Sequence, residues 1–324
     1  METIRVAGRK YTDPDVISLI KATGGLIDPR SAVIHQARKL SANLKRFDAI
    51  PESAMQRMTI LASLRGITVE PMVVERQNTE KRDAILVSTA SGRLILYNPK
   101  RPRGRVVFSI GHEITHTFFP NSVTGARFRN ICESSSKEAN ELERLCDLGA
   151  SELLMPLDQF QAAATGNYSL GNAERLAARF GSSFEATVYR LATAHPALAV
   201  AGLLQYRQRK EEERRAQKLA RQSSLFPGLI KPGVSDPPKY RRQSCYLSEQ
   251  CSDDFTVRWN KSFDPSSVIY RAARTAEAQT SIEALPNEVG LSGRIEAVRA
   301  PYQRENAHPE HPDVLFLWTA DNDV

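Results

Sequence analysis

The amino-acid sequence predicts an α+β protein in which helices pack on a small antiparallel sheet, followed by a helix-turn-helix-like segment and a small C-terminal α+β domain. Three observations support this prediction. Apolar residues recur at helical spacing between residues 13 and 65, short segments rich in Ile, Val and Leu follow them, and a stretch rich in Pro and Gly at 227–238 precedes the last part of the chain. With 324 residues, the chain is long enough for two or three domains.

The N-terminal elements are predicted from their apolar pattern. Val33, Ala37, Leu40 and Leu44 have helical spacing, and Gly66 ends the last of two or three helices. The strands that follow are short and broken by polar or Gly segments, and Pro156 ends the later and longer of two further helices. Strands are predicted at 67–75, 84–88 and 93–97, and helices at 106–118 and 136–155, with a loop at 120–135.

The second half of the chain begins with a helical pair at 169–194 that is broken at Gly181. A charged helix at 206–222 follows it. Strands are predicted at 255–260, 267–271, 294–298 and 314–318. The predicted domains are therefore 1–160, 161–222, which contains the helical pair and the charged helix, and 223–324.

Composition favours a cytoplasmic protein without membrane association. The four cysteines form no CxxC pair, the N-terminus lacks the pattern of a secretory signal, and no uncharged stretch is long enough to span a bilayer. The formal net charge is +7, and most of the basic excess lies in the first hundred residues. Such an excess is only a weak sign of an acidic partner.

The strongest chemical signal is Gly-His-Glu-Ile-Thr-His at 111–116. On a helix, His112 and His116 are four residues apart and face the same way, so both imidazoles can bind one Zn²⁺. Glu113 lies beside them and can take a proton from an activated water. This HExxH pattern predicts a zinc hydrolase.

A zinc hydrolase needs a third protein ligand, and the helix at 136–155 offers one. Glu143 and Asp147 lie four apart on it. Glu143 is expected to complete a His₂Glu set, and Asp147 to accept the free N–H of a ligating histidine. The alternative is a solvated acidic face that includes Glu138, Glu141 and Glu152, among which Glu141 is the main competitor as ligand.

Two segments resemble the ImmA/IrrE-type bacterial metallopeptidases: "LYNPKRPRGRVVFSIGHEITHTFFP" at 96–120 and "ELERLCDLGASELLMP", which ends at Pro156. The resemblance is weaker over the preceding helices and the pair at 169–194, and it does not extend over 223–324. It implies a zincin-like domain with one zinc ion per chain, bound by His112, His116 and Glu143, with Glu113 as the catalytic base. The sequence departs from the family at Thr115, where Gly or Ala is more common, which is expected to alter the packing of the helix.

The resemblance also implies a biological role. Members of the family are cytoplasmic endopeptidases that cut a DNA-binding repressor, often encoded nearby in mobile elements, stress-response loci or anti-phage defence operons. The alternative from another class is a non-catalytic transcriptional regulator that binds DNA or a repressor and uses a structural zinc.

The cysteines allow a further hypothesis about regulation. Cys132 lies in the loop between the two ligand-bearing helices, where its thiolate can serve as an inhibitory fourth zinc ligand, or it is an ordinary loop thiol. Cys146 is expected to be a small core residue. A second metal site formed by Cys245, Cys251, His308 and His311 is disfavoured by their spacing.

Nucleic-acid binding is a separate hypothesis. The helical pair at 169–194 is expected to be a scaffold more than a DNA reader, because its second helix carries only one basic residue, Arg190. Near Tyr206, Tyr240 and Tyr246, basic side chains are candidates for contact with a single-stranded DNA activator, with a solvated connector helix as the alternative. These candidates are Arg214, Arg215, Lys218, Lys239, Arg241 and Arg242.

Overall fold

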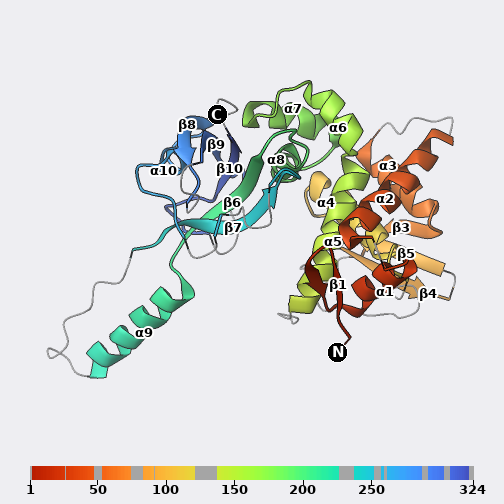
Figure 1. Ribbon diagram of the computed structural model, residues 1–324, viewed down its shortest axis with the longest axis horizontal. Helices are drawn as coiled ribbons and strands as arrows, with labels where there is room; N and C mark the ends of the chain where they lie inside the picture. The colour runs from red at the N-terminus through yellow and green to blue at the C-terminus, as the bar shows by residue number, and fades with distance from the viewer. Residues whose placement is uncertain are drawn as a thin grey trace. The chain divides into compact units, whose positions relative to one another are not determined.

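The computed structural model describes residues 2–25, 27–46, 53–73, 83–90, 92–120, 137–225, 237–251, 257–258, 261–286, 291–302 and 307–320. Helices and sheets alternate along the chain, which confirms the predicted α+β class (Figure 1). The chain divides into two compact units. Unit 1 contains residues 1–163 and 176–183, and unit 2 contains residues 164–175 and 184–324.

Unit 1 begins with a hairpin that was not predicted, β1 (Ile4–Val6) and β2 (Arg9–Tyr11). The helices expected between residues 13 and 65 are then confirmed as α1 (Pro14–Ala22), α2 (Pro29–Ala42), the short 3₁₀ helix η1 (Asn43–Arg46) and α3 (Ala54–Ser63). Asp13 begins α1 because its carboxylate accepts the backbone N–H groups of Asp15 and Val16, at 2.8 and 3.2 Å.

The sheet of unit 1 contains β3 (Ile67–Pro71), β4 (Ala84–Thr89) and β5 (Gly92–Tyr97), in the order β3-β5-β4. The three predicted strands are confirmed, but the expectation of an antiparallel sheet is wrong for one pair. β4 pairs antiparallel with β5, whereas β3 pairs parallel with it. The chain reverses between β3 and β4 and again between β4 and β5, so β3 and β5 run in the same direction. This order leaves β4 as an edge strand.

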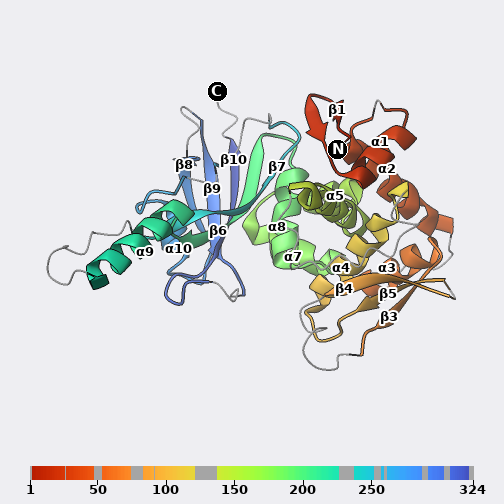
Figure 2. The same ribbon diagram turned by 90° about the horizontal axis from the view of Figure 1, so that it is seen from below.

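Helices α3 and α4 (Arg103–His116) lie on one side of this sheet, and α5 (Lys137–Leu154) packs against α4 and α2 (Figure 2). Two arginines stabilise the helix ends. Arg57 Nε donates to the carbonyl of Leu153 at 3.1 Å, near the end of α5, and Arg65 donates to the carbonyl of Thr117 at 2.5 Å, just after α4. Both helices predicted around the metal motif are confirmed, and their C-terminal ends are fixed by side chains of the same unit.

The packing of α4 on α5 depends on small residues. An added Cβ at Gly111 would lie 3.4 Å from Cα of Ala150, and one at Gly149 would lie 2.3 Å from Cγ2 of Thr115. Thr115 is fully buried and donates its hydroxyl to the carbonyl of Gly111 at 2.9 Å. The unusual Thr115 is therefore accommodated by the missing side chain at Gly149, and the helices stay close.

After α5 come α6 (Leu157–Ala164), α7 (Leu170–Phe180) and α8 (Phe184–Thr193). The break predicted at Gly181 is confirmed, with φ +63° there, which is a backbone conformation that glycine adopts easily. The boundary between the two units passes through α7, and α8 belongs to unit 2.

Unit 2 is built on a five-stranded antiparallel sheet in the order β7-β6-β10-β9-β8. Helix α8 packs on β6, β7 and β10, and the short helix α10 (Val268–Ala272) packs on β8, β9 and β10. Successive residues of β6 face different clusters: Leu203 packs with Leu315, and Leu204 with Phe316. Helix α9 (Lys210–Leu225) projects away from this sheet (Figure 1). The strands are β6 (Ala199–Arg207), β7 (Lys239–Leu247), β8 (Gln279–Ala284), β9 (Ser292–Arg299) and β10 (Val314–Ala320).

The structure confirms the strands predicted at 294–298 and 314–318 and corrects other expectations for this unit. The segment at 267–271 is helical because the Ser267 hydroxyl accepts the N–H of Ile269 and caps α10. The charged helix begins at Lys210, since 199–207 pairs with β7 and β10. Most of 255–260 lies outside the described residues.

The same pairing of β6 explains why the compact units differ from the predicted domains. Because β6 lies between β7 and β10, residues 199–207 belong to the same sheet as the C-terminal strands, and residues 184–324 fall in one unit. Among the described residues, no helix combines the length and apolar character needed to cross a membrane.

Candidate metal centre

Helix α4 presents its two histidines on one face, as the spacing predicts. The Nε2 atoms of His112 and His116 are 3.2 Å apart, and the ring centroids are 4.9 Å apart at an angle of 70°. Their side chains are 17% and 18% exposed. Both rings are thus largely shielded from solvent and direct one nitrogen toward a shared point.

Glu143 on α5 brings its carboxylate to the same point. Its Oε2 lies 3.0 Å from His112 Nε2, and its Oε1 lies 3.9 Å from His116 Nε2. Ligand atoms around a tetrahedral zinc ion are roughly 3.3 Å apart, which follows from bonds of about 2.0–2.2 Å. The three side chains predicted as ligands are therefore brought together at separations that suit one ion.

Glu141, the competing candidate, has another role. Its Oε2 accepts the backbone N–H groups of Thr12 and Asp13, each at 3.2 Å, just before α1. Glu152 is buried and forms an ion pair with Arg38 at 3.0 Å. Neither carboxylate is grouped with the histidines, and Glu138 lies outside the residues whose side chains are described.

Asp147 occupies the outer position predicted for it. Its Oδ1 lies 2.9 Å from Nδ1 of His112, the ring nitrogen directed away from His116. Burial lowers the pKa of His112, but hydrogen bonds with Asp147 and Glu143 outweigh it and raise this pKa to about 10. The surrounding carboxylates thus favour a positive charge at this position.

Cys146 is fully buried, as expected for a core residue, and it also contacts the site. Its Sγ lies 3.4 Å from Nδ1 of His116, and the ligand atoms of His112, His116 and Cys146 lie within 4.8 Å of one another. Among the described residues, these three side chains form a group that could hold a metal ion. The positions 143, 146 and 147 share one helix face, which is the sequence signal for this contact.

Glu113, the predicted base, projects toward the sheet. Its Oε2 accepts the backbone N–H of Leu86 at 3.0 Å. Leu86 belongs to β4, the edge strand. The carboxylate therefore lies between the histidine helix and a strand edge that has no second strand beside it in the described sheet.

The residues present fit a divalent metal ion. Two imidazole nitrogens and a carboxylate oxygen form a donor set typical of zinc, and acidic side chains stabilise positive charge there. In such a site His112, His116 and Glu143 would hold the ion.

Other predicted site residues lie apart from this centre. Cys132 lies outside the described residues. Arg214, Arg215 and Lys218 are exposed on α9, while Lys239 and Arg242 are partly buried on β7.

Arg241 corrects the hypothesis of a basic DNA-binding cluster. Its side chain is 5% exposed and lies 3.3 Å from both carboxylate oxygens of Glu212, which is 4% exposed. This ion pair anchors α9 on β7 and keeps the Arg241 guanidinium out of contact with solvent, where a phosphate would bind.

The tyrosines proposed to stack on bases already contact other rings. Tyr240 is fully buried. Tyr206 stacks on His311 with centroids 3.9 Å apart, and Tyr246 stacks on Tyr189 at 4.1 Å. These rings serve the packing of unit 2.

The second helix of the helical pair also has a structural role. Arg190, its only basic residue, is 4% exposed, and α8 packs on the five-stranded sheet. This burial agrees with the scaffold interpretation and leaves α8 without an exposed basic side chain.

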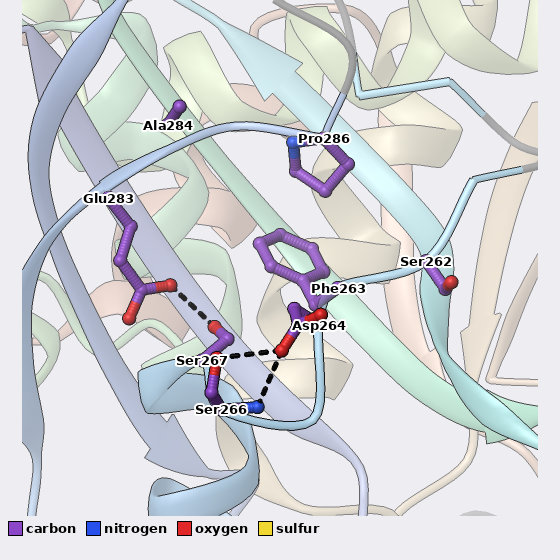
Figure 3. A pocket seen from close by; sticks show the side chains of 8 residues that line it. All are labelled: Ser262, Phe263, Asp264, Ser266, Ser267, Glu283, Ala284 and Pro286. Atoms are coloured by element: carbon purple, nitrogen blue, oxygen red, sulfur yellow. Dashed lines mark hydrogen bonds between the residues drawn. The ribbon is translucent and has the colours of Figure 1, made fainter.

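Unit 2 contains a hollow of about 390 Å³ beside α10 (Figure 3). Its carboxylates already have partners. Asp264 accepts the N–H and hydroxyl of Ser266, and Glu283 accepts the hydroxyl of Ser267 at 2.6 Å and the N–H of Val268 at 2.7 Å. These groups stabilise the start of α10 and do not require a ligand.

Comparison with known proteins identifies a family whose model matches the part of the chain that contains this site. Residues 63–192 match the family model of the IrrE N-terminal-like domain, Peptidase_M78. No curated protein matches the chain significantly. A solved structure of a Mycobacterium tuberculosis transcriptional regulator is similar in fold, with a TM-score of 0.52, 13% sequence identity, and coverage of 95% of this chain and 81% of that chain.

The matched segment contains α4, β4, β5 and α5, and so includes every residue grouped around the two histidines. The resemblance to the ImmA/IrrE-type metallopeptidases is confirmed by this match, and residues 63–192 of the chain form an IrrE N-terminal-like domain of that family.

Proposed function

We propose that the chain is a zinc-dependent endopeptidase that cleaves a DNA-binding transcriptional repressor. The observation that carries this proposal is the convergence of His112 Nε2, His116 Nε2 and the Glu143 carboxylate, with separations of 3.0 to 3.9 Å, beside Glu113. The family match supports the peptidase class, and the ligand set supports one zinc ion per chain.

When bound, the zinc ion would act as a Lewis acid that polarises the carbonyl of the scissile peptide bond. Glu113 removes a proton from the attacking water as the new C–O bond forms, and then delivers it to the leaving amine as the C–N bond breaks. Asp147 holds the ring of His112 through Nδ1, which leaves Nε2 facing His116, where it would bind the metal.

The edge strand β4 suits an extended peptide substrate. The N–H of Leu86 points to the side of β4 that does not pair with β5, because it donates to Glu113. A peptide added along this edge would pair with backbone groups of β4 and pass beside Glu113. Such pairing selects an extended or locally unfolded segment of the substrate.

The proposed substrate is a helix-turn-helix repressor encoded nearby, whose cleavage would derepress a stress, mobile-element or anti-phage defence operon.

Single-stranded DNA is the proposed activator, and α9 provides Arg214, Arg215 and Lys218 as its exposed contacts. Replacing these three residues by Gln should abolish stimulation by single-stranded DNA and leave basal cleavage intact. Equal stimulation of the variant and the wild type would exclude α9 as the contact.

A non-catalytic regulator with a structural metal is the second candidate. The similarity of fold to a transcriptional regulator favours it. Glu113→Gln separates the two candidates, because it removes the base and leaves His112, His116 and Glu143 unchanged. The proposal predicts that this variant retains zinc but no longer cleaves the co-expressed repressor, as followed by mass spectrometry of fragments. Cleavage at the wild-type rate would refute it.

A further inference from the structure

Cys146 lies at the metal centre without a role in the proposed function. It is on α5, three residues after Glu143 and next to Asp147, and it is fully buried. Its Sγ lies 3.4 Å from Nδ1 of His116, within the range of a hydrogen bond to sulfur.

The two ring nitrogens of His116 face different groups. Nε2 lies 3.2 Å from Nε2 of His112 and 3.9 Å from Oε1 of Glu143, so it is the nitrogen directed at the metal position. A neutral imidazole that binds a metal through Nε2 carries its proton on Nδ1. In the metal-bound protein, the N–H of His116 therefore points at the sulfur of Cys146.

We propose that Cys146 is a positioning residue whose sulfur accepts the Nδ1–H of His116, as the carboxylate of Asp147 accepts that of His112. This inference rests on the proposed metal site. Positions 143, 146 and 147 lie on one face of α5, so a single helical turn supplies one ligand and an outer partner for each histidine.

The geometry distinguishes this role from that of a fourth ligand. Asp147 and Cys146 both contact Nδ1 atoms, at 2.9 and 3.4 Å, whereas Glu143 contacts Nε2. Cys146 thus lies behind its histidine as Asp147 does. Because a thiol is a weaker acceptor than a carboxylate, the ring of His116 is held less firmly than that of His112.

The test measures zinc affinity by chelator competition in the full-length chain. Cys146→Ala should weaken zinc binding about tenfold, the lower end of the range for outer partners of metal ligands. Cys146→Ser keeps an acceptor and should restore part of the affinity. Cys245→Ala, which removes a partly buried thiol from β7 in unit 2, is the matched control and should bind zinc like the wild type.

A second measurement reports the hydrogen bond itself. In ¹⁵N-histidine-labelled, zinc-loaded protein, the Nδ1–H signal of His116 should exchange faster with solvent in Cys146→Ala, while that of His112 stays unchanged as an internal reference. A merely structural role would leave both signals equally protected.

Three results would overturn the inference. If Cys146→Ala binds zinc as tightly as the wild type and keeps the protected signal, the inference fails and the proposed metal site stands. If cobalt substitution shows a sulfur-to-metal charge-transfer band that this variant abolishes, Cys146 is a ligand instead. If the wild type binds no zinc, the proposed function fails with it.

Discussion

The contact between Gly149 and Thr115 leads to a quantitative prediction for Gly149→Ala. The added methyl group would lie 2.3 Å from Cγ2 and 2.7 Å from Oγ1 of Thr115, and 3.0 Å from Cγ1 of Val33. Non-bonded carbon atoms prefer about 3.5–4.0 Å, so α4 and α5 must separate or distort. Overpacking of this kind costs about 1–3 kcal/mol, and the helix preference of Ala over Gly offsets about 1 kcal/mol of it.

Urea denaturation with a double-mutant cycle measures this effect. Thr115→Ala removes both atoms that meet the new methyl group, so Gly149→Ala should cost about 1–2 kcal/mol less in the Thr115→Ala background. Gly171→Ala is the matched control, because the nearest atom to its added Cβ is 3.9 Å away. This control should be neutral or stabilising by up to about 1 kcal/mol. Additive costs of the two substitutions at 149 and 115 would refute the packing argument.

Three other predictions concern charge. Arg241→Met should destabilise the protein by about 1.5–3 kcal/mol in urea, because the buried Glu212 loses one charged hydrogen-bond partner and keeps Arg209, at 2.5 Å. The exposed Arg214→Met should change stability by less than about 0.5 kcal/mol, and similar costs for the two variants would show that the pair is not buried. In the metal-free chain, burial lowers the pKa of His112, but hydrogen bonds with Asp147 and Glu143 outweigh burial and raise this pKa to about 10. The stability that the His112 proton provides is therefore complete below the ordinary histidine pKa near 6.5 and is lost as the pH rises toward 10. A free energy of unfolding of the metal-free protein that did not change with pH across this range would contradict this prediction. The same proton must leave when the metal binds, so zinc affinity should rise about tenfold per pH unit between pH 7 and 9 in chelator competition, and a flat profile would contradict this.

Sequence periodicity was sufficient to place the candidate ligands on the faces of two helices. His112 and His116 are fixed by the spacing of a single helix, and Glu143 and Asp147 by the same spacing on the next one. The choice between Glu143 and Glu141 required the three-dimensional structure. Both lie on α5, and only the position of Thr12 and Asp13, just before α1, separates their roles, because their N–H groups bind Glu141.

Burial of charge was harder to predict. Arg241 belongs to a basic run that resembles a phosphate-binding cluster, yet it pairs with Glu212 on a helix that begins at residue 210. Local composition does not show which charges meet across elements that are distant in sequence. The contact of Cys146 with His116 likewise depends on how closely α4 and α5 approach.

Strand pairing was the other part of the fold that local patterns did not determine. The apolar run at 199–207 fits a helix or a buried strand, and its place between β7 and β10 depends on residues more than thirty positions away. The parallel pairing of β3 with β5 likewise depends on which strands become neighbours and on the direction in which the chain returns to the sheet.

The most direct test of the metal centre is native mass spectrometry of the purified full-length chain after loading with zinc. The wild type and Glu113→Gln should each carry one tightly bound ion, and the double variant His112→Ala, His116→Ala should carry none. A wild type without zinc, or a double variant that retains the ion, would contradict the assignment of α4 and α5 as the zinc site.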